Sequence, residues 1–137
     1  MDLARLSLDQ FLNVTDFPEV DPIRDAFVGD FSSFAEIFEP LVREPIRRLS
    51  EHYFLAQLDD DLGDVALMCR NELVGFYHGN VLILHDAHQG RGLSIPLILA
   101  AVKSRPAPGP RMLTTAGRAA LTRAWQVANG LAANPWP

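Results

Sequence analysis

The sequence predicts an α/β fold of the α+β kind, in which a central, mostly antiparallel sheet is flanked by helices. Three short apolar runs follow one another closely, at 64–70, 72–78 and 81–84, with turn sequences between them. Strands joined by such short turns must be antiparallel neighbours in one sheet. Apolar residues at helical spacing precede and follow these runs, and they predict the flanking helices.

Length and composition indicate one domain. The chain has 137 residues, of which 48% are hydrophobic and 21% are charged, values typical of a globular protein. We expect a tail that is loose apart from Trp136, which is placed to dock on this domain or on a partner. The single domain over 1–137 would then consist of a mainly helical part, a part with the sheet, and this tail, at 1–60, 64–128 and 130–137.

The strongest helical pattern lies in the N-terminal part. Six apolar residues recur at three- and four-residue spacing from Phe31 onward. Pro40 and Pro45 exclude one long helix, because proline lacks the N–H that an interior helical turn needs. We therefore expect a break between 39 and 45 and a second helix from Pro45 to about residue 58.

Turn residues separate the strands. The acidic run at 59–61, followed by Leu62-Gly63, indicates a solvated turn, since three adjacent acids alone are a poor metal site. Asn71-Glu72 and Gly79-Asn80 then mark two tight turns, of which the second is a hairpin signal.

Two helices follow the strands. Ser94 is placed to cap the first helix, which extends to about residue 104, and Thr115 is placed to cap the second, over 116–128. A proline-rich loop separates the two helices, and the residues at 111–114 favour a short strand.

Charge and cysteine content narrow the class of protein. The net charge of −5 divides unevenly: residues 1–68 carry 15 acids and 5 bases, a net −10, and residues 69–137 carry 2 acids and 7 bases, a net +5. Such a split predicts either two different partners or attraction between the halves within the fold. The single cysteine, Cys69, excludes an internal disulfide, and no apolar run is long enough for a membrane span, so we expect a cytoplasmic protein without a membrane partner.

The most informative stretch joins the last strand to the next helix. From Leu84 to Ser94 it reads L-H-D-A-H-Q-G-R-G-L-S. A glycine-bearing turn at a helix N-terminus points several backbone N–H groups and the positive end of the helix dipole at one spot, which favours phosphate. Gly90 and Gly92 carry no Cβ that would keep a diphosphate away from the backbone. We expect no metal ion at this loop, because a bound phosphate would occupy the same place.

This order of elements resembles the GNAT superfamily of N-acetyltransferases. The pyrophosphate loop of that family reads Gln or Arg, two residues, Gly, one residue, Gly or Ala, and Gln89, Gly92 and Ser94 occupy the three defined places. The resemblance is good over about 64–105 and weaker over 111–128. Ser94 departs from the family's Gly or Ala, and two further strands of the family have no counterpart here, so the chain would be a short and divergent member with a truncated C-terminal end.

The resemblance implies that acetyl-CoA is the cofactor. The pantetheine arm would lie beside the last strand as an extra strand, and the N–H groups of the loop would hold the diphosphate. Arg91 would add a charge-assisted contact to a phosphate. The expected cofactor-binding residues are Leu82, Leu84, Gln89, Gly90, Arg91, Gly92, Leu93 and Ser94.

The resemblance identifies the catalytic residues less directly than it identifies the cofactor-binding residues. Acyl transfer to an amine needs a base for the amine proton and an acid for the leaving thiolate. The family often takes this acid from a tyrosine on its last helix, but the helix at 116–128 contains no tyrosine. The candidates are His85, Glu72 and Tyr77, each of which also fits an ordinary structural role.

The sequence therefore predicts an acyl-CoA-dependent N-acyltransferase that acts on an amine of a small molecule or a protein. The acidic N-terminal half favours a cationic amine as acceptor. The alternative is a GNAT-like binding or inhibitory protein with weak or no catalysis, which acts through protein–protein contact. The net negative charge disfavours nucleic acid as a partner, and a homodimer stays open.

Overall fold

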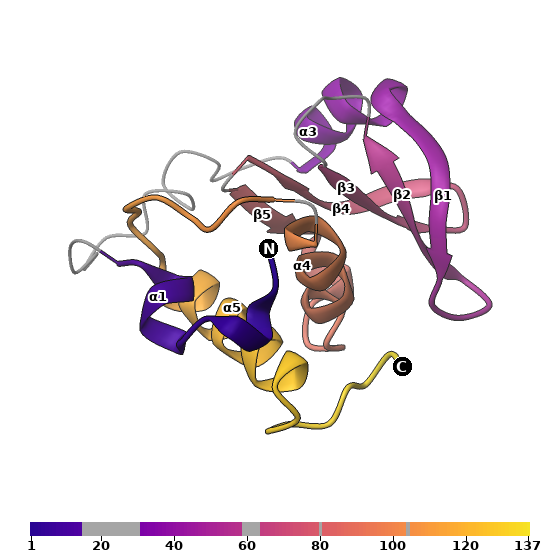
Figure 1. Cartoon of the computed structure of the whole chain (residues 1–137). Helices are drawn as coiled ribbons and strands as arrows, with labels where there is room; N and C mark the ends of the chain where they lie inside the picture. The colour runs from indigo at the N-terminus through magenta and orange to yellow at the C-terminus, as the bar shows by residue number, and fades with distance from the viewer. Residues whose placement is uncertain (15–30, 59–63, 80, 104) are drawn as a thin grey trace.

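Five strands form one antiparallel sheet with helices on its two faces, among the residues that the computed structural model describes (Figure 1). The described residues are 1–14, 31–58, 64–79, 81–103 and 105–137. Each strand pairs with the next in chain order. The strands are β1 (Val42–Arg48), β2 (Tyr53–Leu58), β3 (Val65–Cys69), β4 (Glu72–His78) and β5 (Val81–Leu84). The predicted α+β class with an antiparallel sheet is confirmed.

The helices divide between two hydrophobic clusters. One cluster surrounds Phe76, whose ring centroid lies 4.4 Å from that of Phe38 on α3. The other contains Leu67, Leu97 and Ile98, all fully buried between the sheet and the remaining helices. The helices are α1 (Leu8–Leu12), α3 (Phe31–Phe38), α4 (Ser94–Val102) and α5 (Thr115–Ala128), with short 3-10 segments at Leu3–Arg5, Glu39–Leu41 and Asp86–His88.

The second helix predicted from Pro45 to about residue 58 is wrong, because this stretch forms β1, a turn and β2. Side chains of β2 alternate between the two clusters: Leu55 packs in the α4 cluster and Ala56 in the α3 cluster. Pro45 is tolerated because β1 is an edge strand whose pairing shifts register on both sides of this residue. The described residues of 1–60 consequently contain two strands in addition to helices.

The predictions after residue 64 are largely confirmed. The three strands occur, and the first turn between them uses Arg70 and Asn71 at φ of 52° and 76°, the left-handed pair that suits a tight hairpin. Both later helices occur, but their caps differ from the prediction. Ser94 is the first residue of α4 and no side chain caps that helix, while Thr114, not Thr115, accepts from the N–H of Gly117 on α5.

The segment between α4 and α5 does not form the strand predicted at 111–114. Within the described residues, Arg111 makes one isolated parallel bridge with Val14. Its buried guanidinium donates to the carbonyl oxygens of Leu12 and Phe11, at 2.9 and 2.7 Å, and so ties α1 to this segment. The turn predicted at 59–61 lies outside the described residues.

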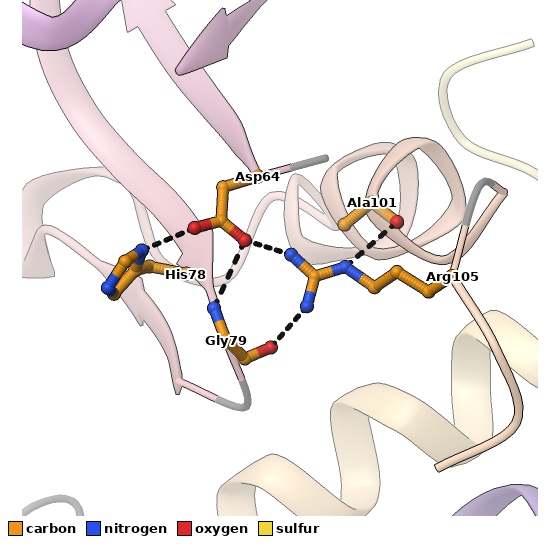
Figure 2. Close-up of polar contacts among 5 residues, drawn as sticks. All are labelled: Asp64, His78, Gly79, Ala101 and Arg105. Carbon is orange, nitrogen blue, oxygen red and sulfur yellow. Dashed lines mark hydrogen bonds and ion pairs between the residues drawn. The ribbon is translucent and has the colours of Figure 1, made fainter. Parts of the chain in front are cut away.

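A buried carboxylate joins the sheet to the end of α4 (Figure 2). Asp64, just before β3, is completely buried, and its carboxylate accepts from the Arg105 guanidinium, contacts the His78 imidazole, and accepts from the N–H of Gly79 at 3.1 Å. Arg105 also donates to the carbonyl oxygens of Gly79 at 2.6 Å and Ala101 at 3.1 Å. The cluster fastens the turn between β4 and β5 to the C-terminal end of α4.

Asp64→Asn should lower the free energy of unfolding by about 3–5 kcal/mol, because it leaves the Arg105 guanidinium without its buried counter-charge. Urea denaturation measures the loss. Glu36→Gln, at an exposed position of α3, is the control and should change stability by less than about 0.5 kcal/mol. A loss from Asp64→Asn as small as that of the control would contradict the role given to this carboxylate.

Candidate functional site

The loop between β5 and α4 folds on its own side chains. The amide of Gln89 donates to the carbonyl oxygen of Leu84 at 3.0 Å and to the carboxylate of Asp86 at 3.2 Å, which holds the two ends of the loop together. Gly90 and Gly92 have φ of 77° and 73°, a left-handed conformation that glycine adopts without strain. Gln89, expected as a cofactor ligand, therefore shapes the loop.

The start of α4 offers backbone N–H groups. Three of them precede the first helical hydrogen bond, the N–H groups of Gly92, Leu93 and Ser94. These three groups donate to no acceptor among the described residues. The N–H of Ile95 closes the first turn on the carbonyl oxygen of Gly92 at 3.3 Å. Together with the exposed side chain of Arg91, the open N–H groups give this end of the helix a positive potential that suits an anion.

The two glycines of the loop have different surroundings. A Cβ placed on Gly90 would meet nothing within 4 Å, so this residue faces open space. A Cβ placed on Gly92 would lie 2.8 Å from Cγ of Pro135. The close approach that glycine permits at Gly92 is therefore used by the chain itself, and only Gly90 leaves room for a ligand.

The outer edge of β5 turns backbone groups away from the sheet. The N–H of His85 donates to the carbonyl oxygen of Val74 at 2.8 Å, which extends the β4–β5 ladder by one pair. Bonded and non-bonded pairs alternate in an antiparallel ladder, so Leu84 and Leu82 belong to non-bonded pairs and point their N–H and C=O groups outward. β5 ends the sheet, and no described residue pairs with this edge as a strand. An extended, amide-bearing ligand can pair there.

A tyrosine and a histidine meet at the base of the loop. The hydroxyl of Tyr53, a buried residue of β2, lies 2.7 Å from Nδ1 of His88. Burial lowers the pKa of His88 below its ordinary value of 6.5, and the charges of His85 and Arg91 lower it further, against the opposing charge of Glu72. His88 is therefore neutral at neutral pH and able to accept a proton.

The structure brings two of the three catalytic candidates to this site. His85 begins the loop, where its Nδ1 accepts from the N–H of Ala87 at 3.1 Å, and the exposed Glu72 begins β4 at the same end of the sheet. Tyr77 lies near the other end of β4, buried, with its ring centroid 5.0 Å from the guanidinium carbon of Arg105. The structure does not bring Tyr77 to the loop.

Sequence reasoning missed Tyr53 as a site residue because it placed Tyr53 in a helix. The signal that could have found it is the short apolar run from Tyr53 to Ala56, which fits a buried strand as well as a helix. For Trp136 the sequence left two alternatives, docking on this domain or on a partner, and the structure shows the first. The indole N–H of Trp136 donates to the carbonyl oxygen of Arg91 at 3.0 Å, so this residue docks on the domain.

The comparisons with known proteins do not identify a family. No family model matches the chain, and neither a curated protein nor a solved structure matches it. In the family that the sequence resembles, the strand corresponding to β5 splays from a further strand, and the described residues contain no such neighbour. Among the described residues, no helix is long and apolar enough to cross a bilayer. The same residues contain no group of three or more His, Cys, Asp or Glu side chains that could hold a metal ion.

His88 should make stability depend on pH. Because its pKa is lower in the folded protein than 6.5, the unfolded chain binds more protons just below that pH, so acidification through 6.5 destabilises the folded state. His88→Gln removes this group, and its free energy of unfolding should fall less between about pH 7 and about pH 5 than that of the wild type. Urea denaturation at several pH values measures both. His52→Gln, at an exposed turn, is the control. If the free energy of unfolding fell equally with pH in the wild type and in His88→Gln, the prediction would be contradicted.

Proposed function

We propose that this protein is an acyl-CoA-dependent N-acyltransferase, with acetyl-CoA as the first donor to test and an amine of a small molecule or a protein as acceptor. The observation that carries the proposal is the path of the backbone, which runs from the outward-facing groups of β5 through one loop to the open N–H groups at the start of α4. Coenzyme A has the matching order of groups, since an arm with two amides ends in a diphosphate.

The residues of this path fit the two parts of coenzyme A differently. The outward N–H and C=O groups of Leu82 and the N–H of Leu84 suit the amides of the arm, while the carbonyl oxygen of Leu84 is already engaged by Gln89. The N–H groups that open α4 and the guanidinium of Arg91 suit the diphosphate. Gly90 supports close approach, because open space surrounds it.

Bound acyl-CoA would supply a thioester carbonyl to the attacking amine, with a C–N bond formed, the C–S bond broken and the thiol released. The chain must then take one proton from the amine and return one to the sulfur. With the diphosphate at the start of α4 and the amides of the arm beside Leu84 and Leu82, the sulfur would lie beyond Leu82, at the end of β5 away from the loop. Tyr53 and His88 lie beside the loop, at the diphosphate end, so these two side chains take no part in the proton transfer. Of the three catalytic candidates from the sequence, only Tyr77 pairs with Leu82.

A second candidate function is binding without turnover, as in a GNAT-like inhibitory protein that acts by protein–protein contact. The packing of Pro135 against Gly92 favours it, because the chain itself occupies part of the space that a diphosphate would use. The two functions differ in whether acyl-CoA is consumed.

Coenzyme A binding tests the site without an acceptor. Gly90→Asp should weaken binding at least about tenfold compared with Gly90→Asn, because the two side chains have nearly the same shape but only aspartate repels a diphosphate. Both residues tolerate positive φ better than other side chains, and Gly90 has open space for either. Isothermal titration with coenzyme A measures both. Failure of the wild type to bind at millimolar coenzyme A would overturn the proposed function.

Turnover separates the two candidate functions. Release of free thiol from acetyl-CoA, with spermidine or a lysine-rich peptide as acceptor, measures the rate. At acetyl-CoA concentrations well below saturation, Gly90→Asp should react at least about tenfold more slowly than Gly90→Asn, because the aspartate weakens binding of the donor. Equal rates for the two variants would contradict the place given to the diphosphate, and binding without turnover in the wild type would favour the second candidate function.

A further inference from the structure

The segment that follows α5 returns to the proposed coenzyme site. In Figure 1 it is the yellow trace that leads to the C-terminal label. Pro135 fills the space beside Gly92, and the indole N–H of Trp136 donates to the carbonyl oxygen of Arg91 at 3.0 Å. The segment thus contacts two consecutive residues of the loop whose backbone would face the diphosphate.

The same segment is also fastened to the sheet. Arg47 of β1 donates to the carbonyl oxygen of Trp136 at 2.9 Å. The indole ring meets the ring of Tyr53 edge-on, with centroids 5.8 Å apart. Asn134 accepts from the N–H of Trp136 at 3.0 Å, which fixes the turn that presents the indole. Trp136 therefore bridges the loop and Tyr53.

We infer that residues 134–136 form a strap that closes the proposed coenzyme site and that coenzyme A displaces when it binds. This inference rests on the proposed function. The contacts of Arg47 and of the Trp136 indole are exposed hydrogen bonds, which are weak and open readily. Opening also frees the guanidinium of Arg47 from the carbonyl oxygen of Trp136, so a cation becomes available beside a phosphate-binding loop.

The strap predicts that binding is weaker than the open site would allow. A site that is closed part of the time binds with an affinity reduced by the closed fraction. Trp136→Ala should therefore lower the Kd for coenzyme A by about fivefold or more, because it removes the contacts to both Arg91 and Tyr53. Leu131→Ala, in the same segment but with 68% of its surface exposed, is the control and should leave Kd unchanged.

NMR spectroscopy of the wild-type protein can detect movement of the strap directly, through the indole N–H of Trp136. The two tryptophans give two indole N–H resonances, which Trp136→Phe assigns. Coenzyme A should shift the Trp136 resonance and speed its exchange with water. The Trp125 resonance should stay in place, because that indole donates to the carbonyl oxygen of Leu6 on the α1 side of the protein.

The outcomes separate the strap from the proposed function. A lower Kd for Trp136→Ala, with a moving Trp136 resonance in the wild type, supports the strap. Equal Kd values with an unmoved resonance overturn the strap and leave the proposed function standing. A higher Kd for Trp136→Ala also overturns it, because Trp136 would then be part of the open site. Absence of binding by the wild type at millimolar coenzyme A overturns the proposed function, and the strap falls with it.

Discussion

The burial of the Asp64 carboxylate constrains most of this structure. A carboxylate with no contact to water is stable only where cations and N–H groups surround it, and here Arg105 and the N–H of Gly79 meet that need. β5 and α4 both run between this cluster and the loop that joins them. Because the far ends of β5 and α4 are fixed at Asp64, the outward edge of β5 and the start of α4 can take few positions relative to each other.

Strand register then sets which side chains reach the loop. Tyr53 pairs with Cys69, and Cys69 pairs with Glu72, so these residues of β2, β3 and β4 lie in one row at the same end of the sheet. His85 leaves β5 at that end as well. A shift of one residue in the β2–β3 register would turn Tyr53 to the α3 face and remove it from His88. The candidate site thus depends on pairing between strands as much as on the loop.

The sequence predicted the parts of the fold that depend on local signals. Turn residues with positive φ, such as Asn71 and Gly79, bound the strands correctly, and Gly90 and Gly92 marked the loop before α4. It failed for β1 and β2, because apolar spacing before residue 58 fits both periods and pairing with β3 decides between them. The contact of Tyr53 with His88 joins distant parts of the chain, and no local pattern contains it.

Glycine in a loop records that something comes close to the backbone, but not what comes close. At Gly92 the close neighbour is Pro135, so this residue alone fits packing of the chain as well as ligand binding. The support for a ligand must come from features that residues 134–136 do not contact. Two such features are the outward edge of β5 and the open space at Gly90, and neither is explained by packing within the described residues. Because one could hold an amide arm and the other could admit a diphosphate, their adjacency favours a ligand that contains both groups.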